Sequence, residues 1–226
     1  NSYSRTDPDA TFMRMKEDAM LNEQLKPAYN LQHGVDSEYI TWLDISSRPT
    51  DTRTLIPFLK DMELYLPLKY QEIVADAGYE SEENYLFLEE NGQLAYIKSQ
   101  NYEISKTRKY RQDIGRMENM KYDEKADCYY CKNGQVLTVQ YEKREKTASG
   151  YRRIVTVYRS SGCGGCPFKT DCIKGNNCKT PMEDRQKVLY VSKKMKEERQ
   201  ETIKQITSDY GTQLRMDRSI QAEGSF

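Results

Sequence analysis

Side chains alternate along two short stretches near the start of the chain, and this pattern predicts a β-hairpin. Residues 28–35 and 39–45 place mainly Tyr, Leu, Ile or Val at every second position, and Asp36-Ser37-Glu38 separates the two stretches. A period of two is typical of strands that bury one face. The polar residues before the hairpin contain one predicted helix, at about residues 10–20.

A helical pattern follows the hairpin. Pro57 can lie in the first turn of this helix and Thr54 is its predicted cap. The apolar residues at helical spacing, which are expected on one buried face, are Leu55, Phe58, Leu59 and Met62.

A strand–helix–strand unit is predicted over residues 72–97. Residues 72–76 form a short apolar run that ends on Asp76, as a buried strand would. Ser81 can cap the helix that follows, and residues 94–97 form the second strand. This order predicts a parallel pair. Asp76 then lies at the carboxyl end of a strand, where open α/β sheets place their active sites.

The second half of the chain has a different character. Residues 121–190 contain all six cysteines and β-rich runs at 135–141 and 152–158, which predicts a β-rich, cysteine-bearing subdomain inserted into an α/β protein. Residues 192–209 predict a charged helix, and a last helix starts near Gly211.

On the last helix Glu223 shares a face with Met216 and Ile220, so we expect its carboxylate to point inward. Two inward carboxylates from distant segments, Asp76 and Glu223, favour a divalent metal site because hard oxygen ligands suit Mg²⁺. The alternative is an N-cap aspartate and a salt-bridged glutamate without a metal.

Charge is divided unevenly, although 35 Lys and Arg balance 35 Asp and Glu over the 226 residues. Residues 1–92 contain 8 basic and 18 acidic residues, whereas residues 93–226 contain 27 basic and 17 acidic residues. A basic half suggests a polyanionic partner, and solvated helix faces are the alternative. No apolar run approaches the roughly 18–20 residues that span a bilayer, which excludes a membrane-spanning protein.

Four segments are expected: residues 1–97, a basic linker over 98–120, the cysteine-bearing insertion over 121–190, and C-terminal helices over 191–226. The first residues lack the features of a signal peptide, so we expect a cytoplasmic protein. A start at Asn1 and an end at Phe226 suggest a piece of a longer protein.

The cysteines form two C-x-x-C pairs, Cys128 with Cys131 and Cys163 with Cys166. Two such pairs separated by β-rich sequence are typical of a structural zinc ribbon with four thiolate ligands. Cys172 or Cys178 could replace one of these ligands. An iron–sulfur cluster, free thiols and disulfides remain as alternatives.

Basic residues interleaved with tyrosines suggest a nucleic-acid surface, because cations contact phosphates and aromatic rings stack on bases. The candidate contact residues are Lys106, Arg108, Lys109, Arg111, Arg152, Arg153, Lys193 and Lys194. His33 is the only histidine, which argues against a hydrolase triad. The sequence contains no G-x-G-x-x-G motif and no P-loop, which argues against a nucleotide cofactor.

Several motifs, in this order, resemble bacterial insertion-sequence transposases of the DDE type. The resemblance extends nearly from end to end, and its specific parts are the Ala-Asp-Ala-Gly-Tyr block and the terminal Glu-Gly-Ser-Phe. The matching segments are Thr6–Ala10, Lys26–Gln32, Arg48–Thr52, Ala75–Tyr79, Ser81–Tyr85, Cys163–Pro167 and Arg218–Phe226.

This resemblance implies an RNase H-like mixed sheet flanked by helices, with a cysteine-rich insertion. Asp76 matches the second catalytic acid of the family and Glu223 the third. The first acid lies in an upstream Asp-Gly-Thr segment, which does not occur here, so the core is expected to lack its first strand and to be inactive alone. A Tyr-Arg-Glu-Lys signature of related transposases is not kept either, because Met216 and Ser219 occupy the Tyr and Arg positions.

The resemblance also implies DNA strand cleavage and strand transfer with two Mg²⁺ or Mn²⁺ ions about 3.5–4 Å apart. The implied partner is double-stranded DNA at transposon ends, bound by a homodimer in the bacterial cytoplasm at the nucleoid. The alternative function is a non-enzymatic, zinc-stapled nucleic-acid-binding protein derived from a transposase.

Overall fold

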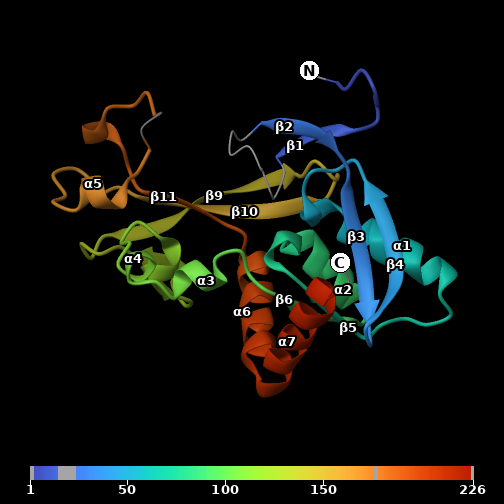
Figure 1. Ribbon diagram of the computed structural model, residues 1–226. Coiled ribbons are helices and arrows are strands. Elements are labelled where there is room, and N and C mark those ends of the chain that lie inside the picture. Colours follow the sequence, from blue (N-terminus) through green and yellow to red (C-terminus); the bar gives the residue numbers. More distant parts are fainter. Residues whose placement is uncertain (1–2, 15–23, 176–177, 225–226) are drawn as a thin grey trace. The chain divides into compact units, whose positions relative to one another are not determined.

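The computed structural model describes residues 3–14, 24–175 and 178–224, with side chains given up to residue 222 in the last helix (Figure 1). The architecture is mixed α/β. The chain divides into two compact units. Residues 1–100 and 198–226 form the first, named here the core unit, and residues 101–197 form the second, named the inserted unit.

The core unit begins with a two-stranded antiparallel sheet of β1 (Thr11–Arg14) and β2 (Leu25–Ala28). The helix predicted at about 10–20 is therefore wrong for residues 11–14, and residues 15–23 lie outside the described residues. Backbone pairing with β2 outweighs the weak helical pattern, and Thr11 and Phe12 both favour extended backbone.

The predicted hairpin is confirmed as β3 (Asn30–Asp36) and β4 (Tyr39–Ser46). Ser37 and Glu38 form the turn with φ of 50° and 71°, as a two-residue hairpin turn requires. The polar Gln32 is buried at 4% exposure, whereas its neighbour Leu31 is exposed. The hairpin thus buries one polar side chain, that of Gln32, within the core unit.

Helix α1 (Leu55–Tyr65) buries all four apolar residues predicted for one face. Thr54 occupies the N-cap position, but its hydroxyl donates to the Asp51 carbonyl instead of accepting from the helix, so the predicted side-chain cap is wrong.

The strand–helix–strand unit is confirmed. Strand β5 (Glu72–Ala75) is parallel to β6 (Leu94–Ile97), and α2 (Glu82–Glu90) connects them. Ser81 caps α2 by accepting from the Asn84 amide at 3.1 Å. In the described part of the chain, β3–β4 and β5–β6 form separate two-stranded sheets and not one mixed sheet, because no strand pairs with both β3 and β5.

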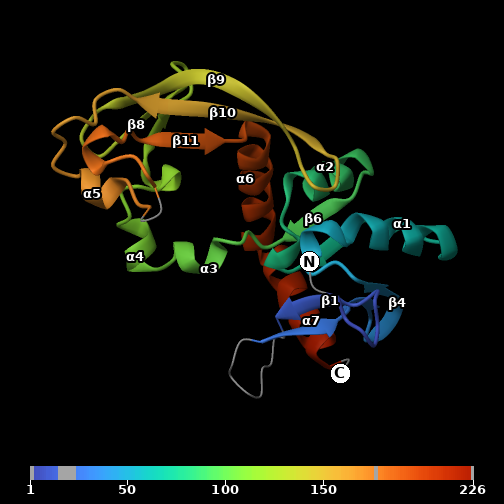
Figure 2. The same cartoon turned by 90° about the horizontal axis from the view of Figure 1, so that it is seen from above.

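The inserted unit starts with two short helices, α3 (Tyr102–Ser105) and α4 (Arg108–Arg111), in the segment predicted as a basic linker. An antiparallel sheet of order β11-β10-β9-β8-β7 follows, and Figure 2 shows β9 and β10 side by side as a long hairpin. Its strands are β7 (Lys121–Asp123), β8 (Cys128–Tyr130), β9 (Val136–Lys146), β10 (Arg152–Ser160) and β11 (Val188–Val191). Both β-rich runs predicted from the sequence are therefore strands, and the short helix α5 (Lys169–Cys172) lies between β10 and β11.

Helix α6 (Lys193–Thr207) leads back into the core unit, and α7 (Asp209–Gly224) contacts β3 and β5. Met216 and Ile220 are 55% and 68% exposed, so the prediction that their face of α7 is buried is wrong. The half-buried face contains Leu214, Arg218 and Ala222 instead. Every helix within the described ranges is too short or too polar to cross a lipid bilayer.

Candidate functional site

Asp76 directly follows β5 and starts the short helical turn η2 (Ala77–Tyr79). Its Oδ1 accepts a hydrogen bond from the Gly78 amide at 2.8 Å, so it is the N-cap of this turn. Its side chain is 50% exposed. The carboxylate is therefore fixed at the carboxyl end of a strand while half of the side chain stays exposed.

Helix α7 reaches this strand end through Arg218. The Arg218 guanidinium lies 3.5 Å from Asp76 Oδ2. Glu223 follows on the same helix, but its side chain lies outside the described residues. Its expected pairing with Asp76 stays a prediction.

A second carboxylate, which the sequence reasoning did not single out, meets Asp76 across Gly78. Asp51 lies in the short turn η1 (Asp51–Arg53). A Cβ placed on Gly78 would be 2.7 Å from Asp51 Oδ2 and 3.0 Å from Asp76 Oδ1. The Arg48–Thr52 segment that resembles the transposases contains Asp51, and this was the one sequence signal that pointed to it.

Two side-chain amides of β3 hold the carboxylate of Asp51 in place. Asn30 Nδ2 and Gln32 Nε2 donate to Asp51 Oδ1 at 2.7 and 3.2 Å. The Tyr79 hydroxyl donates to Gln32 Oε1, which joins η2 to the same network. Burial raises the pKa of Tyr79, and the negative charges of Asp51 and Asp76 raise it further.

The network supplies hard oxygen donors of the kind that Mg²⁺ and Mn²⁺ prefer. Two carboxylates from different segments converge here, and the amides of Asn30 and Gln32 leave the second oxygen of Asp51 facing Gly78. Among the described side chains, no three His, Cys, Asp or Glu residues are already arranged to hold a metal ion. The residues fit a divalent cation only when a further carboxylate joins Asp51 and Asp76.

Glu80 lies close to this site and is almost fully buried at 3% exposure. Arg199 of α6 donates to both of its carboxylate oxygens, at 2.7 and 2.9 Å. The Gln100 amide donates to the same carboxylate at 2.8 Å. The Glu80 carboxylate thus contacts Gln100, which precedes the inserted unit, and Arg199, which follows it.

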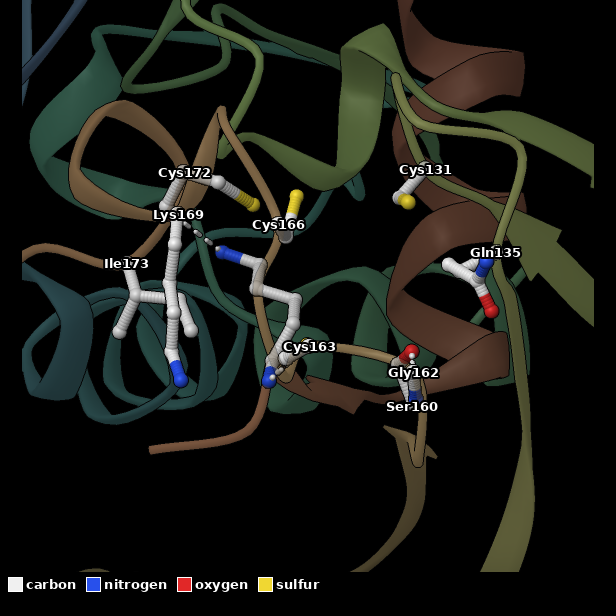
Figure 3. A pocket seen from close by; sticks show the side chains of 10 residues that line it. Cys131, Gln135, Ser160, Gly162, Cys163, Cys166, Lys169, Cys172 and Ile173 are labelled. Atoms are coloured by element: carbon white, nitrogen blue, oxygen red, sulfur yellow. Dashed lines mark hydrogen bonds between the residues drawn. The ribbon is translucent and has the colours of Figure 1, made fainter. Parts of the chain in front are cut away.

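Four of the six cysteines line one cavity in the inserted unit (Figure 3). They are Cys131, Cys163, Cys166 and Cys172. Three of the four predicted zinc ligands are thereby brought together, and Cys128 is not among them. Cys128 is buried within β8, and Cys178 is exposed.

Electrostatic effects in the cavity favour the neutral thiol of Cys172. Burial raises the pKa of Cys172, and its three neighbouring cysteines raise it further, while Lys187 lowers it.

The predicted DNA-contacting residues fall into two groups. Three of them form ion pairs within the inserted unit: Lys106 with Glu103, Arg153 with Glu145 and Lys193 with Asp127. Arg111 donates to the Ser105 carbonyl, and Lys194 is half-buried. In the described ranges, Arg108, Lys109 and Arg152 are exposed and form no ion pair, so they are the most available of the eight candidate contact residues.

The charge asymmetry of the sequence coincides with the two units. The inserted unit contains 22 Lys and Arg against 12 Asp and Glu, a net charge of +10. Since the whole chain is neutral, the core unit carries −10. A unit of this charge favours polyanionic partners.

Residues 130–226 match the family model of the transposase DDE domain. The match extends from the end of β8 to the end of the chain, and therefore includes Glu223 but not Asp76. It supports a DDE-type transposase, a polynucleotidyl transferase type of enzyme and DNA as the partner. The comparisons with curated proteins and with solved structures gave no match.

Proposed function

We propose that this chain is part of the catalytic core of a bacterial insertion-sequence transposase. It would act on double-stranded DNA at transposon ends in the cytoplasm, with an RNase H-like arrangement of the strands around Asp76. The contact between Arg218 and Asp76 carries the proposal. It joins α7, which lies in the segment that matches the transposase DDE domain, to a carboxylate outside that segment.

Asp76 and Glu223 are the proposed catalytic carboxylates that hold Mg²⁺ or Mn²⁺. When bound, the metal stabilises charge on the attacking and leaving oxygens of the phosphodiester. Asn30 and Gln32 orient Asp51 towards Gly78, and Arg218 offsets the negative charge of Asp76. Asp51 therefore supports the carboxylate site in this proposal.

We further propose that these 226 residues bind DNA but do not cut it by themselves. They contain no Asp-Gly-Thr segment, which in the DDE transposases supplies the first catalytic acid. An in-line displacement with two metal ions requires carboxylates that hold both ions in place.

DNA contact is assigned to the inserted unit. Its net charge of +10 supports this, and Arg108, Lys109 and Arg152 are exposed in it and form no ion pair with the described residues. A homodimer on DNA would place two such surfaces along one duplex.

The catalytic proposal is tested by Mg²⁺-dependent cleavage of transposon-end DNA by the complete gene product. Asp76→Ala and Glu223→Ala are each expected to lower cleavage at least a hundredfold with the protein still folded. Asp36→Asn is the matched control, because it removes one exposed carboxylate from the last residue of β3. Undiminished cleavage by Asp76→Ala would exclude Asp76 from catalysis.

The binding proposal is tested by gel-shift titration of this chain at several salt concentrations. Affinity is expected to fall steeply with salt, since each phosphate contact releases a counterion. The double variant Arg108→Ala/Lys109→Ala should weaken binding and flatten this salt dependence. Lys69→Ala, an exposed position of the core unit, should change neither. Binding that does not respond to salt would contradict the assignment.

A further inference from the structure

We infer that Cys131, Cys163, Cys166 and Cys172 bind one structural Zn²⁺ in the inserted unit, with Cys128 and Cys178 outside the ligand set. This inference does not rest on the transposase proposal, because it concerns only the folding of the inserted unit.

The four cysteines come from three separate segments. Cys131 directly follows β8, Cys163 and Cys166 lie in the loop after β10, and Cys172 is the last residue of α5. They line a cavity of about 20 Å³, and in Figure 3 the sulfur atoms of Cys166 and Cys172 point towards one another. This volume has room for a single small occupant, which fits one ion.

The backbone around two of these cysteines forms tight turns. Gly134 has a φ of +72° and its amide donates to the Cys131 carbonyl at 2.9 Å. Gly165 has a φ of +65° between Cys163 and Cys166. The amide of Lys187 donates to Cys163 Sγ at 3.3 Å, a hydrogen bond that stabilises a thiolate. Both turns lie beside cysteines that line the cavity.

The charges around the cavity provide an independent argument. Lys169 is 9% exposed and its ammonium donates to the Glu183 carbonyl, while the Lys187 ammonium donates to the carbonyls of Gly115 and Cys172. Among the described residues neither lysine has a carboxylate partner. Buried cations are costly unless an anion accompanies them. Four thiolates around Zn²⁺ carry a net charge of −2, which offsets both lysines.

Cys128 is excluded by its place in the sheet. It lies inside β8, opposite Asp123 and Thr138, at 3% exposure, and it does not line the cavity. Since the four lining thiols are not yet arranged to hold an ion, we expect zinc binding to draw them together. Such coupling between binding and local folding is usual for structural zinc sites.

The test is the zinc content of the purified full chain and its cysteine variants, measured by elemental analysis. About one zinc per chain is expected for the parent protein. Serine variants of Cys131, Cys163, Cys166 and Cys172 should each retain less than about a tenth of it. Cys128→Ser and Cys178→Ser are the matched controls and should keep it. Loss of zinc in Cys128→Ser with retention in Cys172→Ser would overturn the assignment.

A second measurement uses the parent protein, in case the variants do not fold. Alkylation of thiols followed by mass spectrometry should show that Zn²⁺ protects Cys131, Cys163, Cys166 and Cys172 and that a chelator exposes them, while Cys178 reacts in both cases. Substitution by Co²⁺ should give the visible absorption of a tetrahedral thiolate site. No protection and no Co²⁺ spectrum, or disulfides between these cysteines, would refute the inference.

Discussion

Single residues decide the geometry of the carboxylate site, and Gly78 is the clearest example. Gly78→Ala would bring a methyl group within 2.7 Å of Asp51 Oδ2 and 3.0 Å of Asp76 Oδ1, so at least one carboxylate must move. We expect Mn²⁺ affinity to fall about tenfold, a loss of about 1.4 kcal/mol. Mn²⁺ titration followed by electron paramagnetic resonance measures this. Gly164→Ala is the control, because no heavy atom lies within 4 Å of its added Cβ.

Asp127 makes the stability of the inserted unit sensitive to pH. Burial alone would raise its pKa, but hydrogen bonds from Lys193, Tyr158 and Tyr122 lower it from 3.8 to about 2. The stability that these bonds contribute is present above pH 3.8 and is lost as the pH falls towards 2. Because the side chains of Asp127 and Lys193 are 35% and 43% exposed, we expect an effect of only about 1 kcal/mol.

Acid denaturation followed by circular dichroism would detect this effect. Asp127→Asn suits the measurement, because Asn tolerates the φ of +45° at this position and removes the titrating group at nearly the same size. The variant should lose less stability between pH 4 and 2 than the parent protein. Equal losses in both proteins would show that Asp127 is not the group responsible.

At the scale of elements, the buried pair of Glu80 and Arg199 fixes α6 to the turn that follows Asp76. Glu80→Ala is expected to destabilise the core unit by about 3 kcal/mol, since it removes the buried carboxylate that accepts from two nitrogens of the Arg199 guanidinium. Thermal or urea unfolding measures this loss. Glu103→Ala removes an exposed ion pair with Lys106 and should change stability by less than about 0.5 kcal/mol. Similar losses in both variants would contradict a special role for Glu80.

The elements themselves follow closely from local sequence patterns. The strand that ends just before Asp76, the Ser81 cap and the buried face of α1 were all predictable, because each depends on residues within one or two turns. The role of Asp51 was not predictable from local sequence, because its approach to Asp76 depends on how η1, β3 and η2 pack.

The inferred set of zinc ligands shows the same limit. Equal C-x-x-C spacing selected Cys128, but spacing does not reveal that this residue lies within a strand while Cys131 begins a turn. Helical periodicity likewise grouped Glu223 with Met216 and Ile220 but could not show that α7 packs through another face.

At the scale of the whole molecule, charge and structure separate along the same boundary. The inserted unit is strongly basic and the core unit equally acidic, so the proposed DNA contacts and the proposed carboxylate site belong to different units. The four inferred zinc ligands all lie in the inserted unit. Removal of the zinc should therefore loosen that unit first. Hydrogen exchange in the presence of a chelator is expected to show faster exchange in β8–β11 and little change in α1 and α2. Equal acceleration in both units would argue against a zinc site confined to one of them.

The position of Glu80 has a consequence for the order of folding. Gln100 and Arg199, on either side of roughly 100 intervening residues, both bind this one carboxylate. Bringing the ends of an unstructured loop of that length together costs about 4 kcal/mol in chain entropy. A prefolded insertion avoids most of this cost, because its ends no longer explore a large volume. The core unit should accordingly complete its assembly late, and mutations that slow folding of the insertion should also delay the closing of the carboxylate site.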